Sequence, residues 1–140
     1  MTSPRHFRIT ACFAAVLSLL SLLSMSLVGC TSSTPQNPRL RITNSGMQAI
    51  ENLTVLFPED EIAFGDIPAG ATTEYKEAPG GVYGYAAYRL EIDGQIITQP
   101  VIDWVGEVPM EGKSFTYKLD FDPSRPQLQM AQLIEVTKDE

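Results

Sequence analysis

Apolar and polar residues alternate in short runs along most of the chain after residue 39. Every second side chain of a strand points to the same face, so this alternation is typical of strands that bury one face. The predicted strands are residues 40–43, 53–57, 62–67, 72–77, 86–92, 95–105, 115–121 and 128–137. No stretch of ten or more residues has a clear helical pattern. Residues 129–136 are ambiguous, and their β-branched end favours a strand.

The sequence Asp93-Gly94 is the strongest turn signal, because a two-residue type I′ turn needs positive φ at both positions. This turn predicts a hairpin in which Leu90 pairs with Ile97 and Ile92 pairs with Gln95. Pro100 cannot donate a hydrogen bond to a neighbouring strand. We therefore expect the second strand to be broken, bulged or at a sheet edge near that residue.

Seven or eight short strands separated by Gly- and Pro-containing turns indicate an all-β fold. We predict a single β-sandwich of about 7–8 antiparallel strands over residues 39–140, immunoglobulin-like or transthyretin-like. A small closed barrel is the alternative. No disulfide is expected, so packing alone would hold the two sheets together.

The N-terminus has a different pattern, because residues 9–38 carry no charged side chain. Arg5, His6 and Arg8 precede an apolar stretch over residues 11–27, and small residues follow it. This layout is typical of a secretory signal peptide, here residues 1–29. An uncleaved anchor over residues 9–28 and cleavage to a soluble secreted form are the alternatives.

The sequence Leu27-Val28-Gly29-Cys30 resembles the lipobox of bacterial lipoproteins. The resemblance implies cleavage before Cys30 and acyl chains on that residue, which would anchor the protein to the membrane. Two or more chains hold firmly where one holds only marginally. Residues 30–38 would then be the lipidated Cys and a flexible tether. In bacteria with two membranes, an Asp immediately after the lipidated Cys resembles a signal for retention in the inner membrane. This chain has Thr31 at that position, which favours the outer membrane if the host has one.

Removal of residues 1–29 would leave 8 Lys+Arg and 17 Asp+Glu, a net charge of −9, in 111 residues. Such acidity argues against nucleic acid as a partner and against direct docking on anionic lipid headgroups. The remaining chain has no His, and its only Cys is Cys30. These counts exclude Ser-His-Asp catalysis, a Cys nucleophile and an ordinary zinc site. We expect no enzymatic activity, no cofactor and no metal.

Two acidic groups have an alternative interpretation as cation sites. The run Glu59-Asp60-Glu61 offers carboxylates for calcium but lacks the spacing of a dedicated calcium loop, so a solvated turn is the expected role. Asp120 and Asp122 share one face of a predicted strand, where outward polar positions are again the simpler account. The Gly-rich segment 80–85 lacks the Lys of a phosphate loop.

Aromatic residues suggest a binding surface, with packing as the alternative. Tyr75, Tyr83, Tyr85 and Trp104 are of the types enriched at interfaces. Tyr83 and Tyr85 are expected on one strand face, opposite the core residues of the strand that follows. Lys76 and Asp103 are included in this possible binding surface, and together with Glu107 they lie between apolar positions. We expect one of these two acids to form an ion pair with Lys76 or Arg89.

The order of several segments resembles small bacterial lipoproteins of uncharacterised function, over roughly residues 40–137. The segments are Phe64-Gly65-Asp66-Ile67, Gly70, Glu74-Tyr75-Lys76, residues 83–88, Ile92-Asp93-Gly94, residues 99–107 and Phe115-Thr116-Tyr117. The resemblance implies a secreted β-rich domain and no established activity.

Two functions are compatible with this reading. One is a membrane-anchored, non-enzymatic binding or envelope-interaction module. The other is a structural or accessory subunit of a cell-envelope complex, which would use an exposed edge strand near Pro100 for β-augmentation.

Overall fold

Residues 36–139 are described by a computed structural model, and almost all regular structure in this range is β-strand. The predicted signal peptide, residues 1–29, and Cys30 lie outside the described residues, as does most of the predicted tether. The elements are β1 (Arg39–Asn44), β2 (Ile50–Leu56), β3 (Glu61–Ile67), β4 (Lys76–Glu77), β5 (Ala87–Ile92), β6 (Gln95–Gln99), β7 (Ser114–Phe121), the short 3₁₀ helix η1 (Gln127–Gln129) and β8 (Ala131–Asp139).

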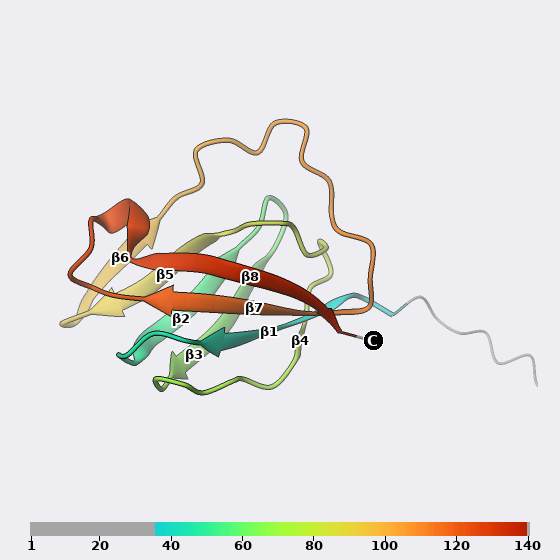
Figure 1. The fold of residues 1–140 in the computed structure, drawn as a ribbon. Helices are drawn as coiled ribbons and strands as arrows, with labels where there is room; N and C mark the ends of the chain where they lie inside the picture. The colour runs from blue at the N-terminus through green and yellow to red at the C-terminus, as the bar shows by residue number, and fades with distance from the viewer. Residues whose placement is uncertain (1–35, 140) are drawn as a thin grey trace, which may run out of the picture. The chain divides into compact units, whose positions relative to one another are not determined.

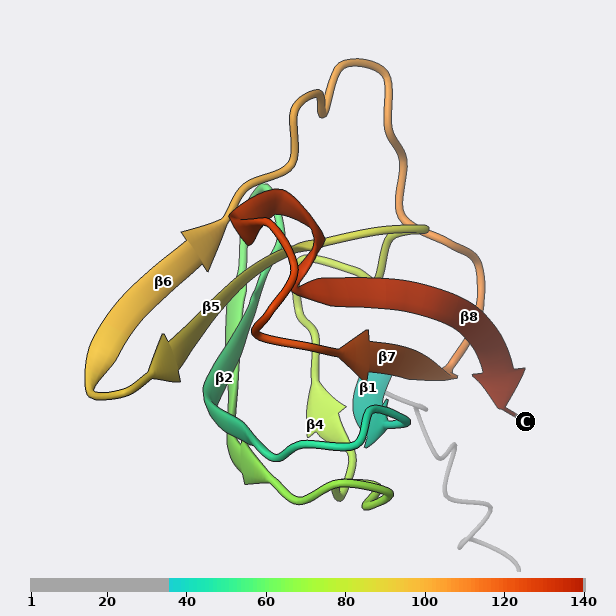
Figure 2. The same ribbon diagram turned by 60° about the vertical axis from the view of Figure 1, so that its left-hand side comes forward.

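The strands form two four-stranded sheets, in the orders β4-β1-β7-β8 and β3-β2-β5-β6 (Figures 1 and 2). This arrangement confirms the all-β sandwich, and two separate sheets rule out the closed barrel. One strand pair departs from the antiparallel prediction, because β1 and β7 run parallel with Arg39 opposite Ser114. Parallel neighbours need a long crossover connection, and alternation within each strand carries no information about such a distant partner.

The core lies between the two sheets and is built from the alternating positions. In β7 the four residues Phe115, Tyr117, Leu119 and Phe121 are all buried, as the sequence predicts. Facing residues on β2 and β5 include Leu53, Val55, Tyr88 and Leu90. A buried aliphatic side chain contributes roughly 1.5–3 kcal/mol to folding, so this packing holds the sheets without a cross-link.

The predicted β5–β6 hairpin is confirmed, with Leu90 opposite Ile97 and Ile92 opposite Gln95. Asp93 and Gly94 have φ of 50° and 75°, as a type I′ turn requires. The second strand ends at Gln99, immediately before Pro100, and β6 is an edge strand. The predicted strand 95–105 is therefore six residues too long.

Other predicted strands also differ in extent, and β2 begins at Ile50, three residues before the predicted start. Only Lys76 and Glu77 of the predicted strand 72–77 form a ladder, while Thr72 makes a single bridge to Thr43. The predicted strand 128–137 begins at Ala131, because residues 127–129 form η1. The ends of strands depend on the available partner backbone, which local alternation does not specify.

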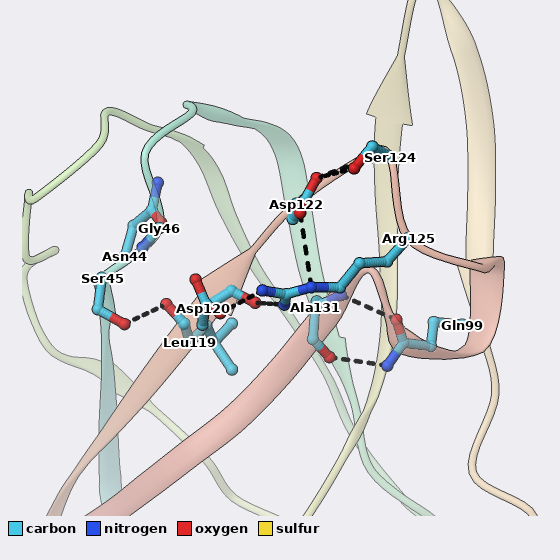
Figure 3. Close-up of polar contacts among 10 residues, drawn as sticks. All are labelled: Asn44, Ser45, Gly46, Gln99, Leu119, Asp120, Asp122, Ser124, Arg125 and Ala131. Atoms are coloured by element: carbon cyan, nitrogen blue, oxygen red, sulfur yellow. Dashed lines mark hydrogen bonds and ion pairs between the residues drawn. The ribbon is translucent and has the colours of Figure 1, made fainter.

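Side chains close both open sides of the sandwich. On one side Gln99 at the end of β6 pairs with the backbone of Ala131 at the start of β8 (Figure 3). Gln127 adds a hydrogen bond to the carbonyl of Thr98 at 2.8 Å. On the other side the Lys76 ammonium on β4 donates to the carbonyl of Ala63 on β3.

A search of residues 36–139 for a helix long and apolar enough to cross a membrane finds none.

Candidate functional site

The most distinctive surface feature is the connection between β6 and β7, residues 100–113. It passes from one sheet to the other and stands away from the strands in both ribbon views, where it is the orange arch (Figures 1 and 2). Connections of more than about 12 residues without regular structure are uncommon and are usually functional or disordered. The contacts below show that this one is held in a defined conformation.

Aromatic side chains brace the first half of the loop. The Trp104 ring stacks on Tyr85 with centroids 5.0 Å apart and meets the edge of Tyr83 at 5.5 Å. The Tyr85 hydroxyl donates a hydrogen bond to the Asp103 carbonyl at 2.7 Å. Aromatic pairs of this geometry contribute about 0.5–1.5 kcal/mol beyond burial, so the three rings hold the loop against the residues that precede β5.

The apex of the loop is a hydrogen-bonded turn over residues 104–107. The Glu107 amide donates to the Trp104 carbonyl at 3.3 Å, and Gly106 has φ of 81°. Gly at the third position of a turn with positive φ is the requirement of a type II turn. The Asp103 carboxylate also accepts a hydrogen bond from the Val105 amide at 2.7 Å. Backbone and side chain together therefore fix the apex.

The second half of the loop is fastened to residues 81–82. The Met110 amide donates to the Val82 carbonyl at 2.7 Å. Gly81 has φ of 93°, and a Cβ atom placed there would lie 2.6 Å from the Cβ of Pro109. Glycine is therefore required both for its conformation and for the close approach. The Arg39 amide donates to the Lys113 carbonyl at 2.9 Å, which places the end of the loop beside the start of β1.

The braced loop presents apolar side chains to solvent. Ile102, Val105 and Val108 are 92%, 89% and 73% exposed. Asp103 and Glu107 lie between them and are also exposed. These five residues are referred to below as the loop tip. Isolated apolar residues are common on surfaces, but clustered ones mark interaction sites.

The electrostatics of the tip are acidic. Burial raises the pKa of the Tyr85 hydroxyl above its ordinary value, with further contributions from the Glu107 and Asp103 carboxylates. The two acids are therefore close enough to disfavour a phenolate at Tyr85. The tip offers aliphatic surface and carboxylates, which suit apolar contact and ion pairing.

The structure brings together four of the predicted binding residues, Tyr83, Tyr85, Asp103 and Trp104. Tyr83, however, is buried, and its carbonyl accepts a hydrogen bond from the Tyr117 hydroxyl. Its ring packs on Phe57 with centroids 5.4 Å apart. The prediction that Tyr83 and Tyr85 share an outward strand face is wrong, because β5 begins only at Ala87 and strand alternation does not extend to residue 83.

The other two predicted binding residues lie elsewhere. The Tyr75 ring contacts the Arg39 and Arg41 guanidinium groups, whose carbon atoms lie 5.2 and 4.6 Å from its centroid. Its hydroxyl donates to Asp139 at 2.7 Å. Burial raises the pKa of Asp139, but hydrogen bonds from Thr116 and Tyr75 and the Arg41 charge outweigh it, so this pKa is lowered. Tyr75 therefore ties the end of β8 to β1.

The predicted ion pair between the loop acids and Lys76 or Arg89 is wrong. Arg89 pairs with Glu61 at 2.6 Å. Lys76 binds the Ala63 carbonyl and lies over the Phe64 ring. Strand pairing decides these partners, because it sets which residues of separate strands become neighbours.

The chain itself supplies a cation for Asp120 and Asp122. The Arg125 guanidinium lies 2.6 Å from the Asp120 carboxylate and 3.6 Å from that of Asp122 (Figure 3). Hydrogen bonds from Ser124 are the main cause that lowers the pKa of Asp122. Among residues 36–139 no three His, Cys, Asp or Glu side chains are grouped so as to hold a metal ion.

Sequence reasoning missed Ile102, Val105 and Val108. Ile102 and Val105 fall within the predicted strand 95–105, and Val108 lies in the connection after it. The signal that could have found them is Pro100, Gly106 and Pro109, which interrupt any strand across this segment. Apolar residues in a segment that cannot be a strand are candidates for exposed contact residues.

Comparison with protein-family models, curated proteins and solved structures finds no match for this chain.

Proposed function

We propose that this protein is a lipid-anchored module of the bacterial cell envelope, on the extracytoplasmic side, which binds another envelope component and catalyses no reaction. The signal-peptide pattern and the lipobox-like sequence Leu27-Val28-Gly29-Cys30 support the anchor. Residues 31–140 contain no His and no Cys, which supports a non-enzymatic role.

The single observation that carries the binding function is the loop tip. Three large aliphatic side chains stand exposed within seven positions. Burying each against a partner is worth roughly 1.5–3 kcal/mol. The three side chains gain this free energy only when a partner covers them.

The bracing of the loop supports the same proposal. Trp104 stacks on Tyr85, and Met110 is hydrogen-bonded to Val82, so both halves of the loop are held in the unbound chain. Ordering a flexible loop on binding costs affinity, and a loop already in place avoids that cost.

The foot of the loop lies near the point where the tether joins the domain. Lys113 is hydrogen-bonded to Arg39, the first residue of β1. A nine-residue tether over 30–38 spans at most about 30 Å when fully extended. With Cys30 in the membrane, the foot of the loop would stay within that distance of the lipid surface.

The anchor is tested by metabolic labelling of cells with an alkyne analogue of palmitate. We expect label on the full-length chain and none on the Cys30→Ala variant, while Cys12→Ala retains label as the matched control. Equal labelling of the chain and the Cys30→Ala variant would contradict lipidation at this residue.

The contact surface is tested by photo-cross-linking in intact cells. A benzophenone amino acid at Ile102 is expected to give a discrete adduct, and the same probe at the exposed Glu51 is expected to give none. Adducts of equal yield at both positions, or none at Ile102, would sink the proposal. Turnover of a substrate by the purified full-length chain would contradict the non-enzymatic role.

The alternative function, an accessory subunit of an envelope complex joined through the edge of β6, has less support. Near Pro100 that edge is partly covered, because Gln127 binds the Thr98 carbonyl and the Gln99 side chain binds Ala131. Adducts from a probe at Gln95 on β6, with none from the loop, would favour this alternative.

A further inference from the structure

The loop tip combines apolar and acidic groups in a fixed order. Asp103 lies between Ile102 and Val105, and Glu107 lies between Val105 and Val108. All five residues of the tip are exposed. The tip therefore presents three aliphatic groups with two carboxylates among them.

A hydrogen bond determines where the Asp103 carboxylate lies, and the Glu107 carboxylate is carried by the apex turn. The Asp103 side chain accepts from the Val105 amide at 2.7 Å, so it is held against the apex turn. The Glu107 amide closes that turn by donating to the Trp104 carbonyl, and its carboxylate is near the Tyr85 hydroxyl. The Asp103 charge is therefore held in place at the tip and needs no reordering to meet a partner.

This arrangement decides between a bilayer and a protein as the partner. Insertion of the aliphatic groups into the hydrocarbon of a bilayer would draw the two carboxylates that lie between them toward it, where losing water is costly. An anionic lipid surface would also repel a chain with a net charge of −9 after signal removal. A protein pocket can instead supply basic groups that pair with both carboxylates.

We propose that the loop tip inserts into an apolar pocket of a second envelope protein whose rim carries Lys or Arg side chains. The inference rests on the proposed function, since it names the partner chemistry for the same site. The aliphatic side chains would supply affinity in the pocket, while the carboxylates would set orientation and partner choice.

The test uses the full-length chain in cells with the benzophenone probe at Ile102. Asp103→Asn combined with Glu107→Gln removes both charges and keeps an oxygen acceptor on each side chain, so the apex turn is retained. We expect the yield of the protein adduct to fall about tenfold, which corresponds to 1.4 kcal/mol. Val105→Ser combined with Val108→Ser is expected to give a similar loss.

The matched control is Glu51→Gln combined with Glu59→Gln, which makes the same change in net charge at two other exposed acids. Its adduct yield should stay within threefold of the unchanged chain. Circular dichroism melts of each variant show whether the fold is retained, and Glu107→Lys, which reverses one rim charge, should lower the yield further.

Several outcomes would overturn the inference. If the variant with Asp103→Asn and Glu107→Gln keeps an adduct yield within threefold of the unchanged chain, the partner does not use Lys or Arg side chains to bind these acids. A phospholipid adduct in place of a protein adduct would identify a bilayer contact. The absence of any adduct from the unchanged tip would instead overturn the proposed function, so the two failures are distinguishable.

Discussion

The side-chain carboxamide of Gln99 makes two hydrogen bonds with the backbone of Ala131. Its Nε2 donates to the Ala131 carbonyl at 2.8 Å, and its Oε1 accepts from the Ala131 amide at 3.0 Å. Gln99 is the last residue of β6 in one sheet, and Ala131 is the first of β8 in the other. A carboxamide offers the same donor and acceptor as a peptide group, so this side chain substitutes for a neighbouring strand at the open side of the sandwich.

Replacing Gln99 should therefore destabilise the fold. Gln99→Ala leaves the amide and carbonyl of Ala131 without these partners in a residue that is 2% exposed. Unpaired buried polar groups cost about 1–3 kcal/mol each, and entry of water lowers that cost, so we expect a loss of about 1–3 kcal/mol in the free energy of unfolding. Urea unfolding of the full-length chain in detergent measures it.

Gln127→Ala is the matched control, because its hydrogen bond to Thr98 is exposed. We expect a loss of at most about 0.5 kcal/mol, which is typical of surface substitutions. Equal effects of the two variants would contradict the role assigned to Gln99.

Two core tyrosines should respond oppositely to loss of the hydroxyl. The Tyr88 hydroxyl is buried and has no hydrogen-bond partner among residues 36–139, whereas that of Tyr117 donates to the Tyr83 carbonyl. Tyr88→Phe removes an unsatisfied polar group and should be neutral or stabilising by up to about 1 kcal/mol. Tyr117→Phe should cost about 1–2 kcal/mol.

The same urea curves compare these two variants, and each serves as the control for the other. A clear destabilisation by Tyr88→Phe would show that its hydroxyl has a partner, such as a buried water.

Alkaline pH should weaken the fold. Burial raises the pKa of both Tyr88 and Tyr117 above the ordinary value of 10.0. In the unfolded chain both phenols lose their protons near pH 10, while the folded chain keeps them neutral. The stabilisation is complete below pH 10 and is lost as pH rises further, at about 1.4 kcal/mol per pH unit for each residue.

Urea unfolding at pH 8, 10 and 11 measures this dependence. Tyr88→Phe removes one of the two phenols, so it should reduce the decline above pH 10 relative to the unchanged chain. An identical decline in both chains would exclude Tyr88 as a source of the effect.

Gly81 should be required for the loop to lie where it does. Gly81→Ala adds a Cβ that would meet Pro109 at 2.6 Å, at a position where φ is 93°. We expect a loss of about 1–3 kcal/mol and faster protease cleavage within residues 101–110. Gly84→Ala is the control, because a Cβ there meets nothing within 4 Å. Unchanged cleavage in the Gly81 variant would show that the Pro109 contact does not hold the loop.

The features that the sequence predicted correctly are local. The hairpin at Asp93-Gly94 is encoded in two adjacent residues that tolerate positive φ, and its register follows from the length of the turn. The buried face of β7 is encoded in its alternation. These features require knowledge only of neighbouring residues.

The site was predicted only in part. Tyr85, Asp103 and Trp104 do lie together, and the two aromatic residues were predicted to belong to a binding surface. Tyr83 was misplaced because it precedes the strand whose alternation was extended to it. Lys76 and Arg89 have partners on β3, and such partners depend on which strands become neighbours.

The sequence by itself determined the all-β class, the strand faces and the β5–β6 turn, because each depends on side-chain period or on one turn. Only the tertiary structure decided the parallel pairing of β1 with β7, the closure of the sandwich by Gln99 and the exposure of the loop tip. Each of these depends on contacts between residues far apart in the chain, and the free energy of such contacts exists only once the two sheets have packed.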